Sequence, residues 1–217
     1  MTESRFLYGA NVHANGIRQH YLRYGGQGQT MVLIPGITSP AITWGFVAEE
    51  LARTFDVYVL DVRGRGLSAT GPDLDYDLDS YPPVSGPGRR AYPAKLDCYT
   101  ESIRLARQGM TSEDMLRFCP SWTEEQRALR AEWLHTCDEL ATRITFEKFH
   151  TEDIHQDIPH LRTPATLVVA TRGGVILPED EAEILALNPS ITVTHVPEAG
   201  HMIPWDNLEG FVVAVGA

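Results

Sequence analysis

The sequence predicts an α/β protein whose mostly parallel sheet is flanked by helices. Four short apolar runs have the length and composition of strands that are covered on both faces. Segments with helical character lie between successive runs. This alternation is typical of parallel strands joined by crossover helices.

The N-terminal part predicts a hairpin followed by a strand–helix–strand unit. The turn-forming segment Asn11–Gly16 precedes a strand over Ile17–Tyr24, so we expect a hairpin at this point. The apolar runs Met31–Ile34 and Val57–Leu60 predict two buried strands, and a crossover helix is expected over Ala48–Arg53.

The C-terminal part shows the same alternation. A strand is predicted over Thr166–Ala170, and an acidic helix start follows at Pro178. A last strand is predicted over Ile191–Val196, just before Gly200 and His201. Both parts therefore belong to the same kind of layered α/β core.

The segment between these two parts has a different character. No strand-like run occurs from Pro93 to about Phe149, and Thr123–Gln126 has the form of a capping box before apolar residues at helical spacing. We expect a helical lid here, with Trp122 and Trp133 on its apolar surface.

The patterns divide one domain of 217 residues into three parts. Residues 1–92 are expected to form the N-terminal part of the core, residues 93–149 the helical lid, and residues 150–217 the C-terminal part of the core. A Pro/Gly-rich connector, Pro82–Gly88, leads into the lid.

Charge and cysteine content exclude several classes of protein. The net charge is −11, from 18 Lys and Arg against 29 Asp and Glu, and such a surface repels nucleic acid and anionic membranes. The three cysteines form neither a disulfide framework nor a zinc motif. With no signal-peptide-like segment and no apolar run long enough to span a bilayer, we expect a cytoplasmic protein.

The turn after the second buried strand matches a dinucleotide-binding pattern only in part. Gly64, Gly66 and Ala69 have G-x-G-x-x-A spacing, and that fingerprint requires a helix N-terminus to hold the pyrophosphate. Gly71–Pro72 follows at once, and then an acidic run begins at Asp73 that would repel phosphate. We therefore expect no nucleotide site.

Three motifs, in this order along the chain, resemble those of the α/β-hydrolases. Ile34–Ile37 resembles the His-Gly turn after the family's third strand, with Pro35 in the place of the histidine. Asp61–Ser68 resembles the D-x-R-G-x-G-x-S turn after the fourth strand, and Ala199–His201, followed by Pro204, resembles the loop of the catalytic histidine. The resemblance covers nearly the whole chain and implies the α/β-hydrolase fold.

The resemblance implies roles for three residues. The backbone N–H of Ile37 would donate to the oxyanion that forms when an acyl carbonyl is attacked, and Gly36 would let the substrate approach the main chain. His201 would accept the nucleophile's proton and return it to the leaving group. We expect both loops to face one pocket at the carboxyl edge of the sheet.

The family's nucleophile is missing from this sequence. The G-x-S-x-G elbow occurs nowhere in the chain. Between the fourth strand and the lid, the family carries a strand, the elbow, a helix and a further strand, a unit of roughly 30 residues or more. This chain has only a loop-like stretch between Asp61 and Pro93, so we expect an absent block near Ser80–Pro83 and a gap in the sheet at Tyr81 and Pro82.

No acidic partner of His201 is assigned. The aspartate that the family usually carries after its seventh strand aligns with Gly174. Glu179 and Asp180 lie nearby, but acids in the first turn of a helix are expected to cap it and to favour its dipole.

Two further groups of side chains are expected to carry no chemistry. Cys98 lacks the flanking glycines of a nucleophile turn, and we expect it to pack within a lid helix. A cluster of potential metal ligands lacks the spacing of one helical face and is expected to be a solvated loop: His150, Asp153, His155, Asp157 and His160.

Two functions remain open on the sequence alone. The first is a cofactor-free and metal-free hydrolase of a small acyl amide, of the amidase or deformylase type that residues 35–44 and 200–205 resemble most. The alternative is a catalytically inactive deletion variant, pseudoenzyme or small-molecule-binding protein. In both cases the expected partner is a small molecule.

Overall fold

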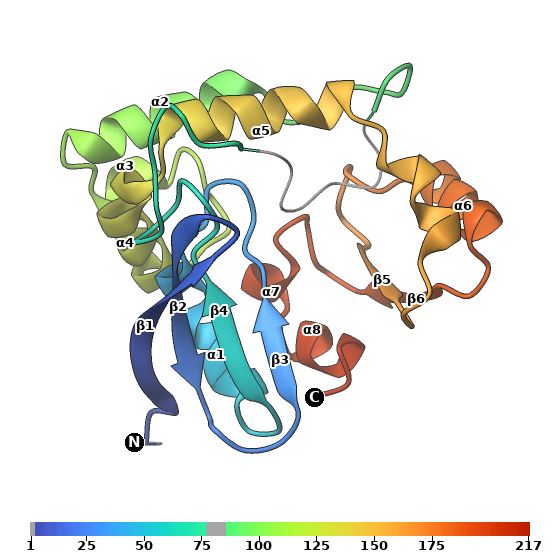
Figure 1. Cartoon of the computed structure of the whole chain (residues 1–217), viewed down its shortest axis with the longest axis horizontal. Coiled ribbons are helices and arrows are strands. Elements are labelled where there is room, and N and C mark those ends of the chain that lie inside the picture. Colours follow the sequence, from blue (N-terminus) through green and yellow to red (C-terminus); the bar gives the residue numbers. More distant parts are fainter. Residues whose placement is uncertain (1–2, 77–85) are drawn as a thin grey trace. The chain divides into compact units, whose positions relative to one another are not determined.

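The computed structural model describes residues 3–76 and 86–217, and the chain divides into two compact units. The first unit comprises Met1–Ser80 and Lys95–Phe146, and the second comprises Tyr81–Ala94 and Glu147–Ala217 (Figure 1). The predicted junction at Tyr81 and Pro82 lies outside the described residues.

The first unit is built on a mixed sheet with strand order β1-β2-β4-β3 (Figure 1). Strands β1 and β2 are antiparallel, as are β2 and β4, whereas β3 and β4 are parallel. The strands are β1 (Phe6–Ala14), β2 (Ile17–Tyr24), β3 (Thr30–Leu33) and β4 (Asp56–Leu60). The two predicted apolar strands are therefore confirmed.

The N-terminal hairpin has a tighter turn than the sequence suggested. Strand β1 continues through Asn11, which pairs with His20, so the prediction of a turn over Asn11–Gly16 was too long. Only Asn15 and Gly16 form the turn, with φ of 51° and 75°. Two central residues at positive φ match the right-handed twist of the flanking strands.

A short helix covers the sheet of the first unit and closes its core. The 3-10 turn η1 (Ala41–Trp44) leads into α1 (Gly45–Leu51), which starts three residues earlier than the predicted crossover helix. The fully buried residues of this layer are Val47, Ala48, Leu51, Val57 and Val59. Each such valine contributes about 1.5–3 kcal/mol by leaving water.

The helical segment predicted over 93–149 is helical in the structure. It contains α2 (Leu96–Arg107), α3 (Ser112–Met115), α4 (Glu124–Trp133), the 3-10 turn η2 (Leu134–Thr136) and α5 (Glu139–Thr151). The predicted capping box is confirmed, because Thr123 accepts a hydrogen bond from the Gln126 amide and the Gln126 side chain accepts one from the Thr123 amide.

Two residues of this segment differ from expectation. Cys98 was predicted to pack within a helix, but it is exposed on α2, because the buried face of that helix is formed by Thr100, Ile103 and Ala106. Trp122 is 7% exposed and lies under the guanidinium of Arg130 at 5.5 Å, so it belongs to the packed interior of the segment.

The second unit contains a two-stranded parallel sheet, several short helices and the C-terminal end of α5 (Figure 1). Its elements are the 3-10 turns η3 (Ile154–Gln156) and η4 (Ile158–His160), β5 (Thr166–Ala170), α6 (Pro178–Leu187), β6 (Thr192–Val196), α7 (Ile203–Asp206) and α8 (Leu208–Ala214). Val196, Ala199 and Ile203 form its buried centre. Both predicted strands and the helix starting at Pro178 are confirmed.

The gap predicted at Tyr81 and Pro82 lies outside the described residues, and the described strands form two separate sheets. Within the described residues, β3 pairs only with β4, and β5 pairs only with β6. The run Met31–Ile34 was expected to be covered on both faces, but Val32 is 52% and Ile34 is 53% exposed. The apolar strand lacks a neighbour on its outer edge within these residues, which leaves it open to water.

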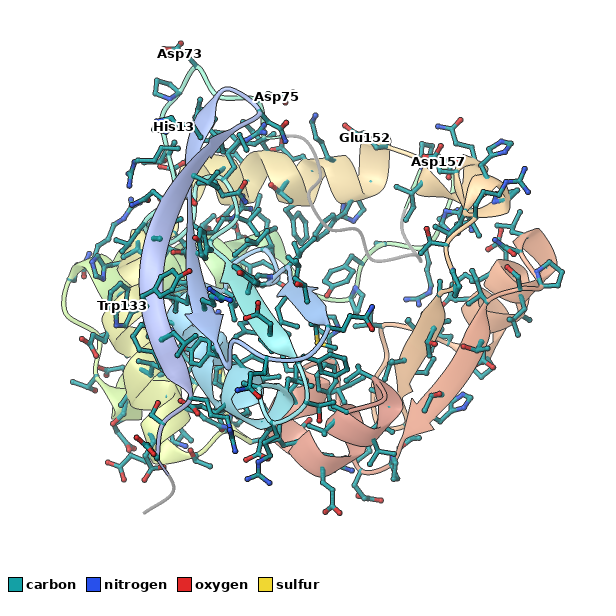
Figure 2. The ribbon with its side chains drawn as sticks, turned by 60° about the horizontal axis from the view of Figure 1, so that its bottom comes forward. His13, Asp73, Asp75, Trp133, Glu152 and Asp157 are labelled. Carbon is teal, nitrogen blue, oxygen red and sulfur yellow. The ribbon has the colours of Figure 1, made fainter. Side chains whose placement is uncertain are left out.

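The surface features are those of an acidic globular chain. Asp73 and Asp75 lie exposed on the loop that follows β4 (Figure 2), and no helix begins between Asp61 and Tyr76. The helix N-terminus that a dinucleotide site requires is therefore missing from this turn.

Of the helices in residues 3–76 and 86–217, none combines the length and apolar character that a bilayer crossing requires.

An exposed apolar edge strand promotes association between chains. We expect Val32→Lys to slow aggregation of the chain, because a charge on β3 opposes strand-to-strand pairing. The measurement is light scattering during incubation at a fixed protein concentration.

The matched control is Val213→Lys, which adds the same charge at a residue that is 70% exposed and lies on the helix α8, not on a strand. Equal slowing by both substitutions would mean that net charge, and not the β3 edge, governs the association.

Candidate active site

The loop after β3 contains a backbone amide that has no acceptor among the described residues. The Ser39 N–H donates to the Gly36 carbonyl at 3.0 Å and closes a tight turn. This bond fixes the Gly36–Ile37 peptide, so the Ile37 N–H points away from the turn, because N–H and C=O of a trans peptide are opposed. Among the described residues the Ile37 N–H has no acceptor.

Gly36 leaves open space beside this amide. The residue is exposed, and a Cβ built on it would meet no atom within 4 Å. Glycine is therefore not required here by the packing of the described protein atoms. Its small size instead leaves room for a ligand to approach the Ile37 N–H.

Two buried arginines hold the next two carbonyls of the loop. Arg65 Nε donates to the Ile37 carbonyl at 2.9 Å, and Arg130 Nη1 donates to the Thr38 carbonyl at 2.9 Å. Arg130 Nη2 also donates to Thr38 Oγ1 at 3.0 Å. Arg65 comes from the turn after β4 and Arg130 from α4, so two separate elements fix the orientation of the loop.

The Asp61–Ser68 motif is explained by contacts of the Asp61 carboxylate. Its Oδ1 accepts from the Ala41 N–H at 2.6 Å, and its Oδ2 accepts from the Leu67 N–H at 3.0 Å. Gly66 has φ of +57°, and a Cβ there would lie 2.0 Å from Asp61 Oδ1, so only glycine fits. The motif therefore links the turn after β4 to the loop after β3 through hydrogen bonds to Asp61.

His20, Asp61 and Ser68 lie together in this unit but do not form a catalytic triad. His20 Nδ1 lies 2.7 Å from Asp61 Oδ2. The Ser68 hydroxyl, however, donates to the Asp61 carbonyl and accepts from the His20 backbone N–H at 2.8 Å. Because the imidazole does not bond the hydroxyl, it cannot activate it as a nucleophile.

His201 lies on the loop after β6, as predicted. The Gly200 N–H donates to Asp206 Oδ2 at 2.7 Å, and the Arg172 N–H donates to the Ala199 carbonyl at 2.9 Å. These bonds fix the loop between β6 and α7. The side chain remains exposed, yet desolvation by the surrounding protein lowers the pKa of the His201 imidazole below its ordinary 6.5, since lost water disfavours the charged ring.

The residue that contacts His201 Nε2 was not predicted from the sequence. The Tyr92 hydroxyl lies 3.1 Å from His201 Nε2, and the two rings meet edge to face with centroids 6.1 Å apart. Within the described residues no carboxylate is bonded to His201 Nδ1. The acid therefore stays unassigned.

The acidic residues near Gly174 lie in the first turn of the following helix, α6. Asp180 accepts from the Leu177 N–H at 2.7 Å and pairs with Arg90, so its predicted role as a helix cap is confirmed. Glu179 is exposed in the first turn of α6. Neither is bonded to His201.

The potential metal ligands at the end of α5 and after it do not converge. Within residues 3–76 and 86–217, no group of three or more His, Cys, Asp or Glu side chains could hold a metal ion. The expectation of a solvated loop was wrong for two of these potential ligands, because His150 lies on α5 and His155 is buried in the turn η3, with Nδ1 3.2 Å from Asp153 Oδ1. Asp153 also accepts the His155 backbone N–H, so it caps the turn η3.

Gly36 and Ile37 belong to the first unit and His201 to the second. The expectation that their loops face one pocket stays a prediction.

The role of Arg130, like that of Tyr92, was not predicted from the sequence. Its helix carries several charged residues, and only the fold determines which of them points inward.

The geometry of the Ile37 loop gives a direct test. Arg130→Met keeps the apolar stem but leaves both Thr38 acceptors without a donor, so we expect the free energy of unfolding to fall by about 1–3 kcal/mol. We also expect faster hydrogen exchange of the backbone amides in residues 37–41, measured by mass spectrometry.

Arg127→Met is the matched control, since Arg127 lies on the same helix and also donates to backbone carbonyls, those of Ser112 and Trp122, but does not touch the loop. Unchanged exchange in Arg130→Met, or equal acceleration in both variants, would contradict the assigned role.

Comparison with known proteins gives a specific relationship. No family model matches the chain. N-formylmaleamate deformylase of Pseudomonas putida strain KT2440 is 54% identical, over 98% of this chain and 97% of that protein. A crystal structure of a serine-to-alanine variant of the N-formylmaleamic acid deformylase from Pseudomonas putida matches with a TM-score of 0.92 and 50% identity, over 97% of this chain and 100% of that chain.

More distant structures share the fold alone. E-2-(acetamidomethylene)succinate hydrolase has a TM-score of 0.72 at 15% identity and covers 97% of each chain. A bromoperoxidase from Bacillus anthracis has a TM-score of 0.74 at 14% identity, over 96% of this chain and 98% of that one.

The alignment with the relative from strain KT2440 is longer than this chain. It spans 259 residues against the 217 of this chain, so at least 42 aligned positions have no residue here. A difference of this size fits the strand–elbow–helix–strand unit of roughly 30 residues or more that the sequence predicted to be absent.

The α/β-hydrolase fold expected from the three motifs is confirmed, and so is the resemblance of residues 35–44 and 200–205 to one branch of that superfamily. With 54% identity over nearly the full length of both proteins, this chain belongs to the N-formylmaleamate deformylase family of α/β-hydrolases.

Proposed function

We propose that this chain carries the oxyanion donor and the general base of an N-formylmaleamate deformylase. The observation that supports this most is the 54% identity to a protein of that name over 97% of its length. The substrate is then a small N-formyl amide, and the products are formate and maleamate. The reaction requires a nucleophile that the chain does not carry in an elbow motif.

The proposed reaction is an acyl transfer in two steps. A serine oxygen attacks the formyl carbon, and the C–N bond breaks as the leaving nitrogen takes a proton. Water then attacks the formyl ester, which releases formate and restores the serine. We propose that the serine lies in the block of at least 42 positions that the relative has and this chain lacks.

Ile37 is proposed as a donor to the oxyanion. Its N–H has no acceptor in the described part of the chain, and the turn bond of Ser39 holds the peptide in one orientation. A preorganised N–H of this kind stabilises developing negative charge without having to rotate during the reaction. Gly36 leaves the approach to it open.

His201 is proposed as the general base and acid. It would take the proton of the serine hydroxyl and deliver it to the leaving nitrogen. The lowered pKa keeps the imidazole neutral near pH 7 and therefore able to accept a proton. Asp206 holds the loop through the Gly200 N–H, which restricts where the ring can lie.

The helical segment 93–149 is proposed as a lid on the substrate pocket, between core parts at 1–92 and 150–217. Its helix α4 reaches the oxyanion loop through the two bonds from Arg130 to Thr38. Movement of α4 would therefore be transmitted to the residue next to Ile37. This direct link between lid and donor supports the assignment.

The proposed compartment is the cytoplasm. Cys98, Cys119 and Cys137 are all free thiols in the described structure. Burial raises the pKa of the Cys137 thiol to about 12 and also raises that of Cys119, so both stay neutral and unreactive at physiological pH. Free buried thiols suit a reducing environment.

Formate release from N-formylmaleamate tests the function. We expect the chain as written to turn over about 10⁶-fold more slowly than a chimera in which the relative's additional block is inserted between Tyr81 and Pro82, since loss of a catalytic serine costs about that factor. Formate is measured with a coupled formate dehydrogenase assay.

Two variants of the chimera complete this test. His201→Gln should abolish turnover to a similar degree, whereas His195→Gln, on an exposed histidine of β6, should leave it unchanged. A chimera that folds but releases no formate would support the alternative, a binding protein without catalysis.

A pH titration of His201 tests whether its pKa leaves the imidazole neutral, and therefore able to act as a base. Because desolvation disfavours the charged imidazole, its proton should leave at lower pH, and the NMR titration midpoint of His201 should lie below 6.5. Deformylation in the chimera should accordingly be lost as pH falls through this pKa, because the protonated ring cannot accept a proton. The His201 signal is assigned by its loss in His201→Gln, and a midpoint above 6.5 would contradict the expectation.

A further inference from the structure

The nitrogen that must accept the proton in the proposed reaction already has a partner. His201 Nε2 lies 3.1 Å from the Tyr92 hydroxyl, and both residues belong to the second unit. In a serine hydrolase this nitrogen faces the nucleophile, and its lone pair must be free of a proton before the reaction. The direction of the Tyr92 hydrogen bond therefore determines whether His201 can act.

Tyr92 is held firmly enough to direct this bond. The residue is 7% exposed, and its ring contacts the Phe149 ring with centroids 5.6 Å apart. Its backbone N–H donates to His150 Nε2 at 3.4 Å, so the end of α5 fixes both the ring and the main chain.

The residues before Tyr92 are anchored as well. Arg89 Nη2 donates to Glu183 Oε1 at 2.8 Å, and Arg90 pairs with Asp180, both on α6. Two arginine–carboxylate pairs and an aromatic contact thus tie residues 89–92 to the second unit. The position of the phenol does not depend on the Tyr92–His201 bond alone.

Chemistry favours the phenol as donor. The phenol proton, with a pKa of about 10, is readily donated, and the imidazole lone pair is a more basic acceptor than a phenol oxygen. Pairing the better donor with the better acceptor gives O–H···Nε2. A neutral ring that accepts at Nε2 carries its own proton on Nδ1.

We propose that Tyr92 is a positioning residue that selects the Nδ1–H tautomer of His201 by donating its hydroxyl proton to Nε2. In the usual triad an acid bonded to Nδ1 makes this selection. Within the described residues no carboxylate is bonded to Nδ1, so the selection is made from the opposite nitrogen. The proposal describes the chain without substrate; its catalytic value rests on the proposed function, in which the serine hydroxyl takes the phenol's place at Nε2 of a ring that already carries its proton on Nδ1.

The tautomer is measurable in the chain as it stands, by nitrogen-15 NMR of the histidine rings at about pH 8, where imidazole is neutral. In the wild-type chain, Nε2 of His201 should show the shift of an unprotonated ring nitrogen and Nδ1 that of a protonated one. Tyr92→Phe keeps the ring but removes the hydroxyl, so the ratio of Nδ1–H to Nε2–H should fall about fivefold, as expected for the loss of one ordinary hydrogen bond.

Tyr76→Phe is the matched control, because Tyr76 is 1% exposed and its hydroxyl bonds Gly71 in the other unit. It should leave the His201 signals unchanged. A protonated Nε2 in the wild-type chain overturns the proposal whatever the variants do, and so does an unchanged tautomer ratio in a folded Tyr92→Phe protein. The readout needs neither the serine nor formate release, so its failure is distinct from failure of the proposed function.

Discussion

The arrangement of the first unit depends on the carboxylate of Asp61. It receives the Ala41 N–H, the Leu67 N–H and the ring of His20, which come from the loop after β3, the turn after β4 and strand β2. A buried carboxylate must be satisfied by donors, so these three segments can adopt only the geometry that supplies them. The turn after β4 in turn places Arg65 against the Ile37 carbonyl. Asp61 therefore determines, through Arg65, how the Ile37 peptide is oriented.

The absence of the block is reflected in the exposure of strand β3. Strand β3 has an apolar composition suited to the interior of a parallel sheet, yet Val32 is 52% exposed. In the described residues the strands before and after the block belong to separate sheets. Ile37 and His201, the proposed oxyanion donor and general base, lie on either side of that block in the sequence. Both residues are therefore present in this chain, whereas the G-x-S-x-G motif is not.

Much of the fold could be predicted from local patterns. The segments 31–33, 57–60, 166–170 and 192–196 are strands, as their short runs rich in β-branched and apolar residues predicted, and the capping box at Thr123 marks a helix because its two bonds are local. Predictions failed where the surroundings decide the outcome. The turn before Ile17 is shorter than its composition suggests, since pairing of Asn11 with His20 extends the strand. Cys98 is exposed because the helix buries a different face.

The sequence by itself determined the family, through three motifs whose order and residue types are required by local turns, and it determined that the nucleophile elbow is missing. Only the tertiary structure decided which side chains support Ile37 and His201. Arg65 and Arg130 lie 28 and 92 residues from their acceptors, and Tyr92 lies 109 residues from His201. Contacts at such separations leave no periodicity or spacing in the sequence, because they arise from packing of whole elements and not from the chain's local conformation.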